Sequence, residues 1–249
     1  MSGFQFLCLG VGDAFSVRWY GSSIALEADG QWLLLDCPHP IHKVVREAAE
    51  TAGLRITCED LSGLLLTHLH ADHASGVEGL AFKSIIYYGH KLRIVCHPDV
   101  AARIWDNHLA AGMDRIIPSP DAAPVRKGLQ DYIEIYPLSD ESAVRFGPFV
   151  IECRRTIHHI PTFAMRIAAA GRILGWSSDT AFDPGLIDWL SAADLIIHET
   201  NVGIHTPYEK LAALPVELRA KMHLIHYPDE FDIEGSVIEC LQPGHVYTV

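Results

Sequence analysis

Short apolar runs recur along the whole chain, and most of them end at a glycine, a proline or a polar residue. Runs of this length, bounded by turn-forming residues, are typical of buried strands. The pattern therefore predicts strands at residues 4–9, 22–28, 32–36, 61–66, 92–96, 132–136, 149–155, 163–169, 172–176, 195–198 and 223–226.

Helices are predicted between these strands, where apolar positions recur at helical spacing. Such spacing runs from Ile41 to Ala52, and Gly53 supplies the residue type that closes many helices. Pro98 begins a second helix over residues 98–106, and residues 186–190 form a third. Residues 117–124 contain three prolines and predict a loop at the midpoint of the fold. Strand runs followed by helices in each half favour an α/β fold of stacked layers.

The composition predicts one acidic domain. A length of 249 residues with 49% hydrophobic content is enough for one substantial core, so we expect residues 1–249 to form a single domain. The net charge of −12 disfavours broad contact with phosphate backbones, because Lys and Arg supply most of that affinity.

The cysteines and the N-terminal segment suggest a location. Six cysteines are spread along the chain without a CxxC pair, which predicts reduced thiols in the cytoplasm. The first residues lack the features of a signal peptide. No apolar stretch approaches the roughly 20 residues of a membrane helix, so we expect no membrane partner. Fifteen histidines point toward metal or proton chemistry.

The motif THLHADH at residues 67–73 follows the apolar run at 61–66 directly. In an extended loop, His68 and His70 point to the same side, and Asp72 and His73 lie on the following turn. One short loop could thus offer ligands to two adjacent metal ions. Neutral imidazole and carboxylate suit zinc, which we prefer, with manganese or iron as alternatives.

Four ligands do not complete two metal sites, so the motif predicts further ligands at later strand ends. The chain supplies a histidine pair after residue 155, an aspartate after the strand at 172–176, and a histidine that ends the strand at 223–226. These candidates are His158 or His159, Asp179 and His226.

With these segments the chain resembles the metallo-β-lactamase superfamily over nearly its whole length. The resemblance implies an αββα four-layer sandwich with the metal site at one edge of the two sheets. It also implies that His68, His70 and His158 hold one metal, that Asp72, His73 and His226 hold the other, and that Asp179 bridges them.

Three assignments have alternatives. His158 fits the family pattern before Pro161 better than His159. His226 ends its strand and is preferred to His223. Asp36 ends a buried strand, where it either orients a histidine without touching the metal or serves as a simple turn residue.

The segment His198-Glu199-Thr200 resembles an element of the ribonuclease Z and phosphodiesterase branch of the superfamily. That branch also carries a histidine about twenty residues before the last ligand, and His205 stands at that place. By this resemblance, His205 would donate a proton to the leaving oxygen and Glu199 would support it; a solvated loop histidine is the alternative reading. His198 is expected to pack or orient.

The resemblance implies a metal-dependent hydrolase, and first of all a phosphodiesterase. Two metal ions would activate a water and clamp the phosphate, and Asp72 could accept the proton of the attacking water. Ribonuclease Z enzymes carry a long arm that grips transfer RNA, and the sequence contains no long polar, Gly/Pro-rich insertion. Together with the acidic charge, this favours a small phosphodiester over long RNA: a cyclic nucleotide, a cyclic sugar phosphate or a short oligonucleotide.

Two other activities fit the same ligands. One is hydrolysis of an ester, thioester or lactone, which would not need His205. The other is a non-hydrolytic di-iron protein that binds oxygen or carries out redox chemistry. Superfamily members commonly form dimers, so the resemblance also suggests a homodimer.

Overall fold

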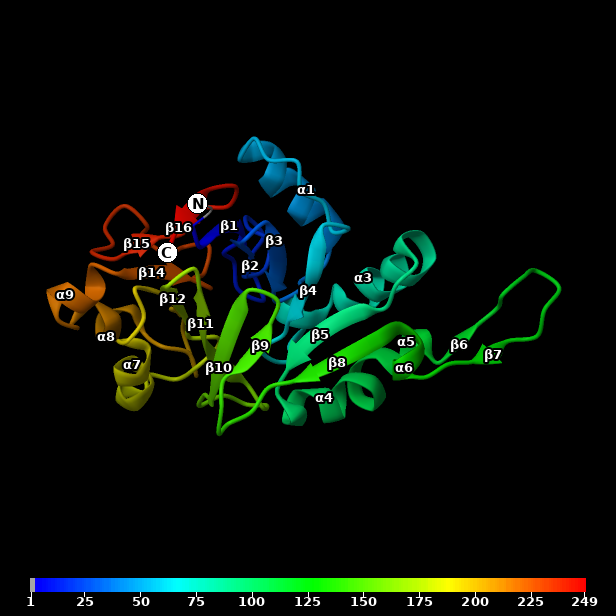
Figure 1. Cartoon of the computed structure of the whole chain (residues 1–249). Helices are drawn as coiled ribbons and strands as arrows, with labels where there is room; N and C mark the ends of the chain where they lie inside the picture. The colour runs from blue at the N-terminus through cyan, green and yellow to red at the C-terminus, as the bar shows by residue number, and fades with distance from the viewer. Residues whose placement is uncertain (1–2) are drawn as a thin grey trace.

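The computed structural model describes residues 3–249, and its centre is a pair of seven-stranded sheets (Figure 1). The first sheet has the order β16-β1-β2-β3-β4-β5-β8. Its strands are β1 (Gln5–Gly10), β2 (Ser23–Ala28), β3 (Gln31–Leu35), β4 (Leu61–Leu65), β5 (Leu92–Cys96), β8 (Ile133–Pro137) and β16 (Val246–Thr248).

The second sheet is formed by the strands from β9 to β15, before the chain returns to the first sheet as β16, and has the order β15-β14-β13-β12-β11-β10-β9. Its strands are β9 (Val144–Phe146), β10 (Phe149–Arg155), β11 (Phe163–Ala169), β12 (Arg172–Trp176), β13 (Leu195–Glu199), β14 (Met222–Ile225) and β15 (Glu239–Cys240). The chain therefore passes from the first sheet to the second in the connection at residues 138–143.

The two sheets share one topology. In the first sheet the three pairings from β16 to β3 are antiparallel and the three from β3 to β8 are parallel. In the second, the pairings from β9 to β12 are antiparallel and those from β12 to β15 are parallel. Each sheet thus has a parallel part in which neighbouring strands end at the same edge.

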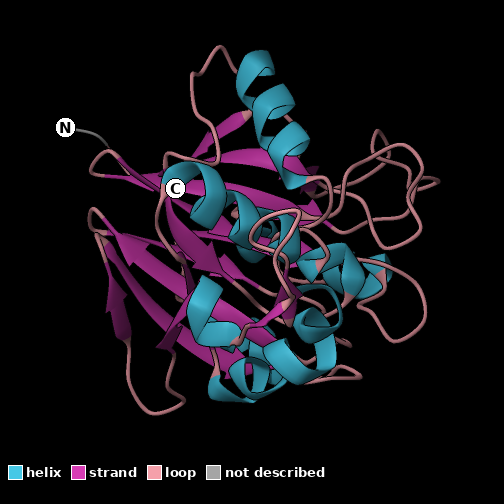
Figure 2. Cartoon of the chain, turned by 90° about the vertical axis from the view of Figure 1, so that its right-hand side faces the viewer, coloured by secondary structure: helices cyan, strands magenta, loops and turns pink. Residues whose placement is uncertain are grey.

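Helices cover the outer faces of the sheets and complete a four-layer αββα sandwich. Helices α1, α3 and α4 lie beside the first sheet and α7, α8 and α9 beside the second, and the view turned by 90° shows helices over the strands (Figures 1 and 2). The helical elements are α1 (Ile41–Thr51), α2 (Ala71–Ala74), α3 (Val77–Lys83), η1 (Ser84–Tyr88), α4 (Pro98–Ile104), η2 (Trp105–Leu109), α5 (Ala110–Met113), α6 (Leu129–Tyr132), α7 (Pro184–Leu190), α8 (Tyr208–Ala212) and α9 (Val216–Arg219). In the described part of the chain, no helix has the length and apolar character needed to span a membrane.

The pattern of apolar residues accounts for these layers. The apolar stripe of α1, which includes Ile41, Val44 and Val45, is buried against the core. The central strand β4 is almost wholly buried because it has neighbours on both edges and layers on both faces. Each expected strand agrees with an observed one to within one residue at either end. The helix expected at 98–106 ends at Ile104, where a π-helical turn takes over.

Residues 117–124 form a loop as expected, but this loop is not the midpoint of the fold. It is the tip of a hairpin made by β6 (Arg115–Ile116) and β7 (Val125–Arg126), which projects from the body of the molecule (Figure 1). No pattern in the sequence indicates a projecting segment at this place, because strands of two residues are too short to produce an alternation of apolar and polar positions.

Candidate metal centre

The predicted ligands come together at the edge where strands of both sheets end. His70 has an extended backbone, and α2 begins directly after it, so that Asp72 and His73 lie on the first turn of that helix. This is the extended loop followed by a turn that the spacing of THLHADH predicts. The second sheet supplies three residues that follow β10, β12 and β14 respectively: His158, Asp179 and His226.

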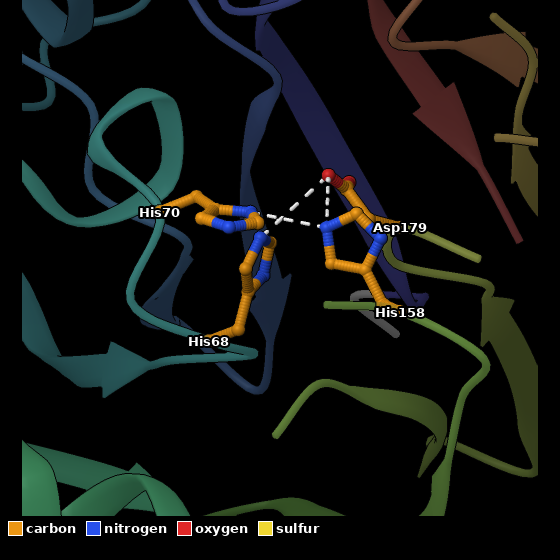
Figure 3. Close-up of side chains that lie close together, drawn as sticks. All are labelled: His68, His70, His158 and Asp179. Carbon is orange, nitrogen blue, oxygen red and sulfur yellow. Dashed lines mark hydrogen bonds and ion pairs between the residues drawn. The ribbon is translucent and has the colours of Figure 1, made fainter. Parts of the chain in front are cut away.

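A first cluster contains His68, His70, His158 and Asp179, whose ligand atoms all lie within 4.8 Å of one another. The three imidazoles and the carboxylate point toward one another in Figure 3. Nε2 of His68 and Nε2 of His158 lie 3.6 Å and 3.5 Å from Oδ2 of Asp179. Nε2 of His158 is 3.0 Å from Nδ1 of His70.

A second cluster contains Asp72, His73, His226 and again Asp179. Nε2 of His73 lies 3.2 Å from Oδ1 of Asp179 and 3.4 Å from Oδ2 of Asp72. Nε2 of His226 lies 3.1 Å from Oδ2 of Asp72. Oδ1 of Asp179 thus faces the second cluster, and Oδ2 lies between the first cluster and Nε2 of His226, which is 3.8 Å away. This is the arrangement expected of a carboxylate shared between two sites.

The chemistry of the donor atoms fits divalent cations. Nε2 of His68, Nε2 of His73 and Oδ1 of Asp179 are buried, and none has a hydrogen-bond partner. Buried polar atoms without partners are costly. A cation in each cluster would satisfy these atoms, and imidazole with carboxylate is a common donor set for zinc, manganese and iron.

Asp36 lies next to the second cluster and contacts the imidazole of His73 on the side away from the other candidate ligands. Its carboxylate is fully buried and lies 2.9 Å from Nδ1 of His73. It also accepts hydrogen bonds from the backbone N–H and the hydroxyl of Thr67. A proton on Nδ1 of His73 leaves Nε2 free to act as a ligand, so Asp36 orients the ring, which is the first of the two roles expected from the sequence.

The backbone is strained at three points of this edge. Their residues are Asp36, Ser178 and His226, with φ values of 58°, 52° and 58°. Residues other than glycine rarely adopt such values. The amide of Asn201 holds the strained segment at His226 by donating to its carbonyl at 3.0 Å, and it also donates to Asp13. Neither Asn201 nor Asp13 was predicted from the sequence, because no motif marks either residue.

A histidine–glutamate pair lies against the two clusters. Nδ1 of His205 is 3.0 Å and 2.9 Å from the two carboxylate oxygens of Glu199, which also accepts from the backbone N–H of Thr180. Burial lowers the pKa of His205, but the hydrogen bonds and the charge of Glu199 outweigh this and raise it above its ordinary value. His198 points elsewhere: it is buried and bonds the backbone carbonyl of Glu199.

The pKa values of the imidazoles differ between the two clusters. In the second cluster, burial lowers the pKa of His226, but Asp179, Asp72 and Glu199 outweigh this and raise it to about 10. Burial, reinforced by the neighbouring histidines, lowers the pKa of His70 and of His158 to about 4, so both rings are neutral at physiological pH, as ligands must be. Burial alone would raise the pKa of Asp72, but His73 and His226 hold it below its ordinary value, so this carboxylate is ionised.

The two histidines that the sequence left as alternatives lie outside the clusters. His159 is exposed, and its ring centroid is 6.2 Å from that of His70. His223 pairs with Glu239 at 3.4 Å. The structure therefore brings together all seven predicted ligands, with His205 and Glu199 beside them.

Comparisons with known proteins identify the family and the fold of the chain. The family model for "Anti-Pycsar protein Apyc1" matches residues 4–239. The Anti-Pycsar protein Apyc1 of Bacillus phage 010DV004 is 28% identical over 261 residues, covering 96% of each chain. The metallo-β-lactamase fold protein YhfI of Bacillus subtilis superposes with a TM-score of 0.77 at 19% identity, covering 99% of both chains.

The short form of human tRNase Z superposes with a TM-score of 0.68 at 18% identity, over 98% of both chains. The fold is thus the metallo-β-lactamase fold, and a tRNase Z is among the solved structures that share it. Because the family match spans nearly all of its residues, the chain belongs to the Anti-Pycsar protein Apyc1 family, on a metallo-β-lactamase fold.

Proposed function

We propose that this protein is a dinuclear metal-dependent phosphodiesterase that hydrolyses small phosphodiesters, with a cyclic nucleotide as the preferred substrate. One observation carries the proposal: the His205–Glu199 pair lies directly against two His/Asp clusters that share Asp179. A proton donor beside a metal site is what cleavage of a P–O bond with a poor leaving group requires.

His68, His70 and His158 would hold one ion, Asp72, His73 and His226 the other, and Asp179 would touch both. Two divalent ions in such a site supply Lewis acidity toward phosphoryl oxygens and an activated water. We prefer zinc because the donors are mostly imidazole nitrogens, with manganese or iron as alternatives.

The proton movements fall to the protein's own side chains. Asp72 is ionised and about 12% exposed, so its carboxylate can accept the proton of the attacking water. His205, whose pKa is raised by Glu199, is charged over a wider pH range than a free histidine and can protonate the departing alkoxide. Glu199 is 1% exposed and keeps the proton of His205 on the nitrogen that it faces, which orients the other nitrogen toward the clusters.

A small substrate agrees with the charge of the molecule. A net charge of −12 disfavours contact with a long phosphate backbone. The likeness to a tRNase Z, whose name gives a nucleic acid as its substrate, supports a phosphodiester as the bond that is cut.

The test is hydrolysis by protein of known metal content. Metal analysis and a visible absorption spectrum come first, followed by assays with bis-p-nitrophenyl phosphate, 3′,5′-cyclic nucleotides, thioesters and lactones. We expect two metal ions per chain and cleavage of the phosphodiesters. The variant Asp179→Asn should lose this activity, whereas His223→Gln, which alters a histidine outside both clusters, should retain it.

Other outcomes would reject the proposal. Cleavage of thioesters or lactones alone would assign the site to carbonyl chemistry. Two irons with visible absorption and no hydrolysis of any substrate would identify the di-iron alternative.

A further inference from the structure

A cavity of about 670 Å³ opens beside Asp72, outside both clusters. One wall is formed by residues 13–21, the connection between β1 and β2, and the other by residues 38–39 together with residues 71–75. Its volume lies within the range of about 300–1,000 Å³ that is usual for small-molecule sites. Of the proposed metal ligands, Asp72 alone is among the described residues that line this cavity.

The wall made by residues 13–21 is fixed in place by the carboxylate of Asp229. The hydroxyl of Ser16 donates to Oδ1 of Asp229 at 2.5 Å, and the backbone N–H groups of Val17 and Arg18 donate to Oδ2 at 2.8 Å and 3.2 Å. Asp229 itself stands three residues after His226. One carboxylate therefore connects this loop to the segment that carries a proposed ligand.

The same wall touches the metal-site helix without any intervening side chain. A Cβ atom at Gly21 would lie 2.6 Å from the carbonyl oxygen of Asp72 and 2.9 Å from Cβ of Pro38. Only glycine permits this approach, so the end of the loop at Gly21 packs on Asp72, three residues beyond the segment 16–18 that Asp229 bonds.

The lining offers an aromatic face and an immobilised cation. The guanidinium of Arg18 lies 5.1 Å from the ring centroid of Trp19 and donates to the backbone carbonyl of Asp229 at 3.0 Å. The two oxygens of Asp13 accept from the backbone N–H of Phe15 and from the amide of Asn201, so both are engaged within the protein. A planar ring with polar edges is the kind of group that such a surface recognises, by stacking and by hydrogen bonds from Arg.

We propose that this cavity binds the nucleoside part of a cyclic nucleotide whose phosphate lies at the clusters. We also propose that Asp229 is the positioning residue that holds the loop of residues 13–21 in place. The proposal rests on the function proposed above and adds a base-binding subsite to it. The base would lie against the pair formed by Arg18 and Trp19, held by stacking and by hydrogen bonds from Arg18.

The first test fills the cavity. Ala14 lines it and is exposed, so Ala14→Trp can occupy the space without disturbing the core. Relative to the wild type, kcat/KM for a 3′,5′-cyclic nucleotide should fall by at least about tenfold, the scale of one lost stacking contact. Activity on base-free ribose 3′,5′-cyclic phosphate should change less than about twofold, since that substrate has no base to stack. Val216→Trp, on exposed α9, is the matched control and should change neither.

The second test removes the hydrogen bonds by which Asp229 holds the loop of residues 13–21. Asp229→Ala should raise KM for the cyclic nucleotide while kcat stays close to the wild-type value, and the base-free substrate should be unaffected. A loss of kcat on both substrates would show that Asp229 serves the metal site in general, and would overturn its assignment as a positioning residue for the base. Circular dichroism of the variant checks that it is folded.

Failure of this inference differs from failure of the proposed function. If the wild type cleaves both substrates with the same kcat/KM, and Ala14→Trp affects them equally, no base-binding subsite exists although the protein is a phosphodiesterase. If the wild type cleaves neither, calorimetry decides: metal-loaded protein should bind a nucleoside 5′-monophosphate at least about tenfold more tightly than ribose 5-phosphate. Equal affinities would overturn the subsite.

Discussion

Asp36 lies outside both clusters, but its contacts orient one histidine ring in each of them. It is fully buried, lies 2.9 Å from Nδ1 of His73 and accepts two hydrogen bonds from Thr67, whose hydroxyl is in turn 2.9 Å from Nδ1 of His68. The orientation of two imidazoles in the two clusters therefore depends on this carboxylate. The positive φ of Asp36 is a strain that these contacts hold in place.

Replacing Asp36 with Asn should weaken metal binding by about 10–100-fold, because an amide cannot fix the ring of His73 as a carboxylate does. Competition with a chromophoric chelator measures this affinity. Asp60→Asn is the matched control, since Asp60 is an exposed aspartate that bonds only Thr57. Equal affinities in the wild type and Asp36→Asn would mean that Asp36 has only a structural role.

Replacing His205 with Ala should slow only the step in which the leaving oxygen is protonated. We expect kcat to fall by about 10²–10⁴ for a cyclic nucleotide, whose leaving alkoxide needs a proton. The loss should be much smaller for bis-p-nitrophenyl phosphate, because p-nitrophenolate departs without one. His159→Ala, at an exposed histidine outside the clusters, serves as control. A loss of equal size on both substrates would contradict the role of a proton donor.

At the scale of elements, the connection between β1 and β2 depends on one charged contact. The hydroxyl of Ser16 and the backbone N–H groups of two following residues lower the pKa of Asp229 below its ordinary value. A carboxylate with a depressed pKa stabilises the folded state at pH values above its unfolded pKa of about 3.9, and this contribution is lost as the pH falls through the lower folded pKa.

The difference in free energy of unfolding between the wild type and Asp229→Ala should therefore be constant near neutral pH and shrink as the pH falls below about 4. Urea unfolding at a series of pH values measures it. Asp60→Ala provides a comparison at another exposed carboxylate that bonds a nearby backbone N–H. A difference that does not change between neutral and strongly acidic pH would show that the charge of Asp229 does not hold the loop.

Long strands could be predicted from the sequence, and short strands could not. Strands of five or more residues, such as β4 and β10, carry enough apolar positions to be located from the sequence. Strands of two or three residues, such as β9 and the two strands of the projecting hairpin, carry too few. These short strands form because a longer strand or a partner across a turn is already in place.

At the scale of the whole molecule, the candidate metal centre joins the two halves of the chain. Four of its residues follow β4 in the first sheet, and the other three follow strands of the second sheet. Each half alone leaves an incomplete set of donors. Bound metal should therefore hold the sheets together as well as provide chemistry, because it binds the folded state and not the separate halves.

Removal of the metal with a chelator should lower the midpoint of thermal unfolding by roughly 10 °C, the shift expected for a site that is saturated well above its dissociation constant. Differential scanning calorimetry with and without re-added zinc measures this. The chelator presaturated with calcium is the control. An unchanged midpoint would mean that the donors do not bind metal across the two sheets.

Local spacing was enough to predict the layers, the long strands and most of the candidate donors: an apolar run predicts a strand wherever it lies, and HxHxDH places four candidate donors on one loop and turn. Spacing could not show that His158 and His226 lie in the clusters whereas His159 and His223 lie outside them, because this depends on how the two sheets pack. Tertiary structure also decided the contacts of Asn201 and Asp229, and the projecting hairpin. These depend on which segments meet across the fold, and no local pattern encodes a partner from a distant part of the chain.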